Sequence, residues 1–116
     1  MNPEEMKKRT KEFAKRVINL CRKLPATEEA RLIRNQLFRA GTAVGANYRA
    51  VCQGRSKADF ISKLGIVLEE ADESLYWLEL LVETKIMPEK LLGPLMDEAN
   101  QLIGVFVASL NTAKGK

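Results

Sequence analysis

Four acidic residues, Glu69, Glu70, Asp72 and Glu73, lie within one short stretch near the middle of the chain. Carboxylates this close in sequence can bind a divalent metal or share a proton in acid–base catalysis. The surrounding residues have helical periodicity, however, and at about 100° per residue the four side chains point in several directions. They therefore predict a solvated face that pairs with basic helices, and neither a metal site nor a catalytic pair.

The chain contains no histidine and two cysteines, Cys21 and Cys52, which are too far apart for a Cys-x-x-Cys pair. Without histidine there is no Ser–His or Cys–His nucleophile, and mixed Cys/His zinc sites are excluded. The Glu-x-x-His pairs of di-iron bundles are excluded for the same reason. We therefore expect a protein that is not an enzyme, that has no metal or cofactor, and whose thiols stay free in a reducing compartment.

Basic residues are concentrated in the first half of the chain. Residues 1–58 hold 14 Lys and Arg against 5 Asp and Glu, a charge of +9, whereas residues 59–116 hold 5 against 10, a charge of −5. Several of the cations fall opposite the apolar stripe of their helix, where they can follow a phosphate backbone. The predicted nucleic-acid contacts are Lys8, Lys11, Lys15, Arg22, Arg31 and Arg49. Two other interpretations stay open: lysines are ordinary solvating residues, and some arginines pair with the acids of the second half.

Four amphipathic segments must position these side chains. Apolar residues recur every three or four positions, which predicts helices at about 3–24, 27–53, 56–84 and 88–111. Pro25, Gly54 and Pro88 punctuate the connections, with Gly54 expected to end the second helix. Because the connections are short, the predicted fold is all-α: a single domain, residues 1–116, that forms an antiparallel up-down-up-down four-helix bundle.

The helix ends carry their own signals. The expected N-caps are Asn2, Thr27 and Ser56. In the fourth segment, Pro94 lies well inside the periodic pattern, so we expect either a kink at this residue or a true helix start at Gly93–Pro94. The inward-facing stripe of that segment is predicted to begin with Leu91.

A run of small residues occupies the second segment, and it consists of Ala40, Gly41, Ala43, Gly45 and Ala46. Each glycine costs a helix about 1 kcal/mol relative to alanine, so two of them within five positions indicate that another backbone approaches closely. That backbone belongs either to a second subunit or to a neighbouring helix of the same bundle, and the second interpretation is favoured.

The third segment carries a second apolar face. Opposite its inner stripe lie Ile66, Trp77 and Leu80, with Tyr76 beside them. A helix of a monomeric four-helix bundle needs only one apolar face, and Trp and Tyr are enriched at interfaces. These four residues are the predicted homo-oligomer interface, and the alternative is that they are scattered surface apolar residues.

The total length of 116 residues, with 46% hydrophobic and 29% charged residues, suits one globular domain. No apolar run approaches the length of a membrane span, and the acidic start Met1–Glu5 does not resemble a signal peptide. We therefore expect a cytoplasmic protein with no membrane contact.

Three stretches resemble a known family: RAGTAVGANYR at 39–49, RSKADF at 55–60 and LGIVLEEADESLYWLELL at 64–81. The family comprises four-helix bundle proteins named after the open reading frame in intervening sequences of bacterial 23S rRNA genes. It includes the accessory variability determinant of diversity-generating retroelements. Ala50 stands where its members often have an acid.

The resemblance implies a ring-like homopentamer with a basic surface, and its retroelement members imply nucleic acid and a reverse transcriptase as partners. Two hypotheses follow. In the first, the chain is a non-catalytic, homo-oligomeric accessory protein that binds RNA or DNA through the phosphate backbone. In the second, it is a protein-interaction scaffold with no nucleic-acid role, and its basic half serves only its own acidic half and a protein partner.

Overall fold

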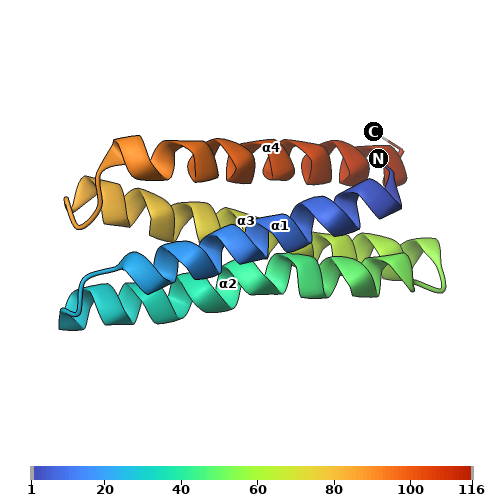
Figure 1. Ribbon diagram of the computed structural model, residues 1–116. Helices are drawn as coiled ribbons and strands as arrows, with labels where there is room; N and C mark the ends of the chain where they lie inside the picture. Colours follow the sequence, from blue (N-terminus) through green and yellow to red (C-terminus); the bar gives the residue numbers. More distant parts are fainter. Residues whose placement is uncertain (1, 116) are drawn as a thin grey trace.

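The computed structural model describes residues 2–115, which form four α-helices (Figure 1). They are α1 (Pro3–Lys23), α2 (Glu28–Cys52), α3 (Lys57–Glu83) and α4 (Glu89–Ala113). Every boundary lies within two residues of its predicted position. The all-α fold class is therefore confirmed. None of the helices within residues 2–115 combines the length and apolar character needed to cross a bilayer.

The helices form an elongated antiparallel bundle of 45 × 22 × 21 Å. Helix α1 packs on α2, α2 on α3, and α3 on α4, so consecutive helices are neighbours. The fourth seam, between α1 and α4, has far fewer contacts than the other three. Helix α1 begins at the same end of the bundle at which α4 ends (Figure 1). This is the predicted up-down-up-down topology.

Side-chain caps fix three of the four helix starts. Asn2 Oδ1 accepts hydrogen bonds from the backbone N–H groups of Glu4 and Glu5, at 3.0 and 3.2 Å. Thr27 Oγ1 accepts from a backbone N–H at the start of α2 at 3.3 Å, and Ser56 Oγ accepts from that of Asp59 at 3.0 Å. The three predicted N-caps are therefore confirmed. Each satisfies amide groups that have no partner within the helix.

Two expectations about helix ends need correction. Gly54 does not end α2 through a left-handed conformation, because Gly115 is the only glycine within residues 2–115 with positive φ and α2 already ends at Cys52. Helix α4 starts at Glu89, so the alternative start at Gly93–Pro94 is wrong and Pro94 lies inside the helix. Pro94 is exposed, and water can solvate the carbonyl group that its ring leaves without a partner.

The core is formed by the predicted inward stripes. Phe13, Val17, Leu37, Leu64 and Phe106 belong to a single buried cluster. Leu91 is the exception: its side chain is 47% exposed, so its placement in the core was wrong. It lies in the first turn of α4, beside the loosely contacted seam with α1, where no helix covers it.

The small-residue run brings α2 against α1 within the same bundle. A Cβ added to Gly41 would lie 2.7 Å from a Cγ atom of Val17, and one added to Gly45 would lie 3.3 Å from the backbone of Thr10. Helix α1 therefore occupies the space that larger side chains would need. Close packing inside the bundle, the favoured interpretation, is confirmed for these two glycines.

Candidate nucleic-acid interface

The predicted cations of α1 all lie on its outer face. Lys8, Lys11, Lys15 and Arg22 are exposed. Lys15 is 3.4 Å from Glu12 on the same helix. Lys8 and Lys11 form no ion pair with any other residue of the described range 2–115. The charge of these two ammonium groups is therefore available to an external anion.

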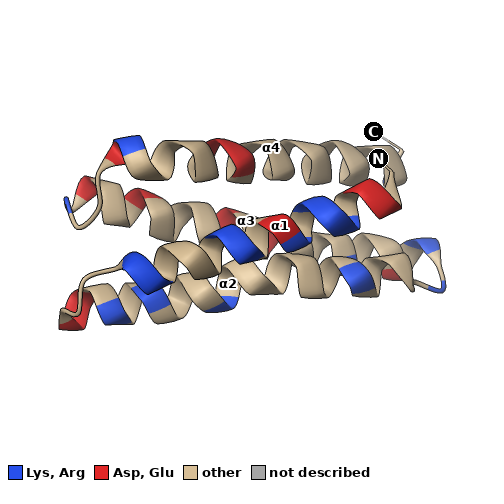
Figure 2. Ribbon diagram, viewed as in Figure 1, with Lys and Arg blue, Asp and Glu red and all other residues tan. Residues whose placement is uncertain are grey.

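Arg31 and Arg49, the two predicted contacts on α2, are also exposed. They are eighteen residues apart, which is about 27 Å along a helix. Arg31 lies 3.9 Å from Glu28, whereas Arg49 forms no ion pair within residues 2–115. Lys and Arg follow α1 and α2 along much of their length (Figure 2).

A shallow groove of about 240 Å³ between α1 and α2 brings part of the predicted set together. Its lining residues are Lys7, Lys11, Ala14, Thr42, Gly45, Ala46 and Arg49. Gly45, which has no side chain, lets the two backbones approach closely, and Ala46 adds only a methyl group to the floor of the groove. Cationic side chains of both helices border this floor. The groove therefore has the shape and charge to accept a phosphate group. We call it the α1–α2 basic groove.

The groove unites Lys11 and Arg49 but not the rest of the predicted set. Lys8 and Lys15 lie outside it on α1, and Arg22 and Arg31 lie toward the opposite end of the two helices. Lys7, which the sequence prediction missed, is the third cation of the groove, and its Nζ lies 3.4 Å from Glu4. The run of small residues was the sequence signal for this site, because a close helix approach creates a groove bordered by the flanking side chains.

Two other arginines are paired with carboxylates of a neighbouring helix, and the first of them is the exposed Arg39. Arg39 of α2 donates to Glu70 of α3 at 3.0 Å and also to Glu73, and the Glu73 carboxylate accepts a hydrogen bond from Trp77 Nε1 at 3.0 Å. The hydrogen bond to Glu73 is the main cause that raises the pKa of Arg39. The pKa of Glu73 is lowered, and the hydrogen bond from the Trp77 indole is the main cause. The basic half of the chain is thus partly compensated by its acidic half, as one of the open interpretations expected.

Arg9 forms the corresponding link across the α1–α4 seam. Its Nε and Nη2 atoms each donate to Glu98 at 2.8 Å, and Nη2 also donates to Gln101 at 2.8 Å. The hydrogen bonds to Glu98 raise the pKa of the Arg9 guanidinium. Arg9 therefore joins the two adjacent helices of the bundle that have the fewest other contacts.

The acidic stretch of α3 does not converge on one point. Glu70 and Glu73 turn toward Arg39, whereas Glu69 and Asp72 are exposed. Within residues 2–115, no group of three or more Cys, Asp or Glu side chains is arranged to hold a metal ion. The two inner carboxylates are engaged in binding α2, which is the pairing that the sequence predicted.

The predicted oligomer residues of α3 differ in exposure. Ile66 is 44% exposed and Tyr76 is 52% exposed, whereas Trp77 and Leu80 are half-buried. The rings of Tyr76 and Trp77 meet edge to face, with centroids 5.1 Å apart. Trp77 is held by its hydrogen bond to Glu73, so it lies at the edge of the α2–α3 contact, and Tyr76 and Ile66 present the open apolar surface.

Comparison with known proteins bears directly on this arrangement. The model of the family described as 23S rRNA-intervening sequence protein matches residues 4–108. The chain belongs to this family. Comparison with curated proteins gave no match.

A solved relative supports the fold of this member of the 23S rRNA-intervening sequence family. It is the crystal structure of a protein of unknown function from the S23 ribosomal protein family of Bacteroides thetaiotaomicron VPI-5482. The two chains are 35% identical, the TM-score is 0.84, and the match covers 90% of this chain and 96% of the other. The four-helix arrangement therefore extends over nearly the whole of both proteins.

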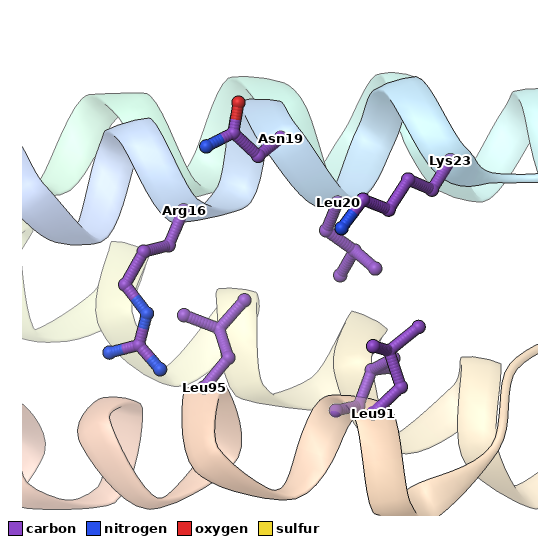
Figure 3. A pocket seen from close by; sticks show the side chains of 7 residues that line it. Arg16, Asn19, Leu20, Lys23, Leu91 and Leu95 are labelled. Atoms are coloured by element: carbon purple, nitrogen blue, oxygen red, sulfur yellow. The ribbon is translucent and has the colours of Figure 1, made fainter.

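This family member also has a second groove, on the α1–α4 seam. It encloses about 180 Å³ and is lined by Arg16, Asn19, Leu20, Lys23, Leu91, Leu92 and Leu95. Leu20 of α1 and Leu91 and Leu95 of α4 point into the space between the two helices, and Arg16 extends toward α4 (Figure 3). Its floor is formed by leucine side chains, and its two cations, Arg16 and Lys23, both belong to α1, whereas cations of both helices border the α1–α2 basic groove.

Proposed function

We propose that this chain is a non-catalytic, homo-oligomeric accessory protein that binds RNA or DNA. The contact is made to the phosphate backbone by the α1–α2 face, which comprises Lys8, Lys11, Lys15 and Arg22 of α1, Arg31 and Arg49 of α2, and Lys7 of the groove. The protein recognises the charge of the nucleic acid more than its base sequence, because the chain has no known motif that contacts base edges.

One observation carries this proposal: the α1–α2 basic groove is bordered by cations from both of its helices that are unpaired in the described part of the chain. Arg9 and Arg39, at the other seams of the bundle, bond to carboxylates of a neighbouring helix. Lys11 and Arg49 instead border the α1–α2 basic groove and have no ion pair within residues 2–115. Unpaired cations that border one groove from two helices suit an anion such as a phosphate, because each phosphate contact releases counterions from the nucleic acid.

Binding can be measured by fluorescence anisotropy with labelled RNA and DNA oligonucleotides over a range of salt concentrations. The logarithm of the affinity is expected to fall linearly with the logarithm of the salt concentration, by about 0.7–0.9 per phosphate contact. The double substitution Lys11→Glu, Arg49→Glu is expected to weaken binding to all sequences and to make this slope shallower by about two contacts.

The matched control is Lys90→Glu. Lys90 is an exposed lysine of α4, on an element that does not line the groove, and its reversal makes half the change in net charge. It is expected to change affinity only slightly. No binding by the wild-type protein at low salt, or equal losses for the single control and the groove variant, would overturn the proposal.

Homo-oligomerisation is proposed through the α3 surface formed by Ile66, Tyr76, Trp77 and Leu80, with five copies as the number that the family resemblance implies. The exposure of Ile66 and Tyr76 supports this interface, since both are large apolar side chains of α3 that the bundle itself leaves uncovered. Sedimentation of the wild type and of the variant Tyr76→Ser, Ile66→Ser tests it. We expect the variant to dissociate, and a monomeric wild type would refute the assembly.

The same apolar surface favours a second candidate function, a protein-interaction scaffold without a nucleic-acid role. In that case the oligomer forms and depends on Ile66 and Tyr76, but no salt-sensitive affinity for oligonucleotides is found. The anisotropy and sedimentation measurements together separate the two functions, because only the first requires the groove cations.

A further inference from the structure

A single aromatic ring stands exposed at the middle of the α1–α2 face. Phe38 is 46% exposed. It belongs to the stripe of α2 that faces α1, together with Arg34, whose carbonyl oxygen accepts from the Cys21 thiol at 3.9 Å, and Gly41, which packs on Val17. These two contacts fix the antiparallel register of the helices and place Phe38 at the level between Val17 and Cys21 of α1.

Cationic side chains lie on both sides of this ring along the seam. Thr42, one helical turn from Phe38 and about 6 Å along the axis, lines the α1–α2 basic groove with Arg49. In the other direction, Arg31 lies two turns away on the same face of α2. Phe38 therefore lies between two cations of α2, Arg49 and Arg31, which are about 27 Å apart along the helix.

We propose that the nucleic acid bound by this face is single-stranded, and that one of its bases stacks on Phe38. This inference rests on the proposed function and specifies its substrate. In a duplex each base is paired and stacked between its neighbours, so an aromatic ring on the surface of a helix has no base face to contact. In a single strand the bases turn outward, and their stacking on aromatic side chains is tolerant of sequence because every base has a π-face.

The spacing along the seam fits such a strand. The basic groove receives a phosphate at one end through Lys11 and Arg49, and Arg31 receives another beyond the ring. A cationic track with an aromatic platform in its middle is the combination that single-strand-binding proteins use without reading sequence.

The test compares a labelled single-stranded oligothymidylate of about twelve nucleotides, a length within the site sizes of single-strand-binding proteins, with a duplex that carries the same number of phosphates. Phe38→Ala is expected to weaken single-strand binding about tenfold, while duplex binding and the salt dependence stay as in the wild type. Phe38→Trp is expected to keep the affinity, and its indole fluorescence should be quenched by the single strand. Circular dichroism verifies that each variant is folded.

Leu32→Ala is the matched control, because Leu32 is also an exposed apolar residue of α2, 57% exposed, and should affect neither ligand. Equal affinity of the wild type for the two ligands, or an unchanged single-strand affinity in Phe38→Ala, overturns the stacking inference and leaves the backbone-binding function standing. Absence of binding to both ligands overturns the function and the inference together.

Discussion

The contact between Gly41 and Val17 makes the substitution Gly41→Ala a direct test of how α1 and α2 pack. A Cβ at position 41 would lie 2.7 and 2.8 Å from the two Cγ atoms of Val17 and 3.1 Å from its Cβ. Carbon atoms that are not bonded normally stay about 3.5–4.0 Å apart. Val17 is fully buried and β-branched, so it has few alternative rotamers into which it can move. The two helices must therefore separate locally.

Two opposing terms set the size of the effect. Alanine is better than glycine inside a helix by about 1 kcal/mol. Forcing an extra methyl group into a packed core costs about 1–3 kcal/mol, and distances below 3 Å place Gly41→Ala toward the upper end of that range. We therefore expect the free energy of unfolding to fall by about 1–2 kcal/mol. For a domain of 116 residues the melting temperature should fall by about 4 °C for each kcal/mol.

Urea and thermal denaturation followed by far-ultraviolet circular dichroism measure this change, and Gly104→Ala is the matched control. Gly104 is exposed in α4 and has no atom within 4 Å of the added Cβ, so its replacement should stabilise the protein by about 0.5–1 kcal/mol. Val17→Ala removes two buried methyl groups and should destabilise the wild type, but it should cost less in the Gly41→Ala background because it also removes the clash, which gives a favourable coupling energy. If Gly41→Ala stabilises the protein as Gly104→Ala does, the explanation of the small-residue run is wrong.

Two further predictions concern α3. Ser56→Ala removes the N-cap of α3 and should lower the free energy of unfolding by about 1 kcal/mol. Ser56→Asp should retain most of the capping stabilisation, and urea denaturation at neutral pH measures the stability of the two variants. The hydrogen bond from Trp77 and the pairing with Arg39 lower the pKa of Glu73, so ionised Glu73 stabilises the fold above the pKa of about 4.3 that a glutamate has in an unfolded chain. This stability is lost as the pH falls through the lower folded-state pKa, and Glu73→Gln should therefore lose less stability than the wild type between about pH 5 and pH 3. Equal pH profiles would contradict that assignment.

The helices could be predicted from the sequence because local signals agree with one another. Apolar residues at helical spacing, the caps Asn2, Thr27 and Ser56, and short connections all specify the same four segments. Leu91 escaped prediction because periodicity reports which side of a helix is apolar, but not whether a neighbouring helix covers that side. The α1–α4 seam is loosely contacted, so a residue on its edge stays exposed.

Several cations of the candidate site could be predicted from the sequence, but which of them lie next to one another could not. Facing positions on α1 and α2 follow from the register of the two helices, which the sequence indicates only as a close approach at Gly41 and Gly45. The convergence of Lys11 with Arg49, the role of Lys7 and the position of Phe38 all depend on that register. The partners of Arg39, which is paired with α3, likewise depend on how the helices face one another.

The distribution of ion pairs also couples anion binding to stability. No ion pair within residues 2–115 joins α1 to α2, and the pairs on their outer faces link side chains three positions apart on one helix, which contribute little. Two helices rich in cations thus pack side by side at this seam, and their mutual repulsion is relieved by salt.

An anion held in the basic groove should relieve this repulsion more effectively, and it stabilises the folded state according to its concentration relative to its dissociation constant. Inorganic polyphosphate is therefore expected to raise the melting temperature of the wild type at low salt, by an amount that shrinks as salt is added. In Lys11→Glu, Arg49→Glu the protein without ligand should gain melting temperature from the charge reversal and respond weakly to polyphosphate. A variant that melts lower than the wild type, yet gains as much from polyphosphate, would show that the groove cations are neither a source of repulsion nor the site of binding.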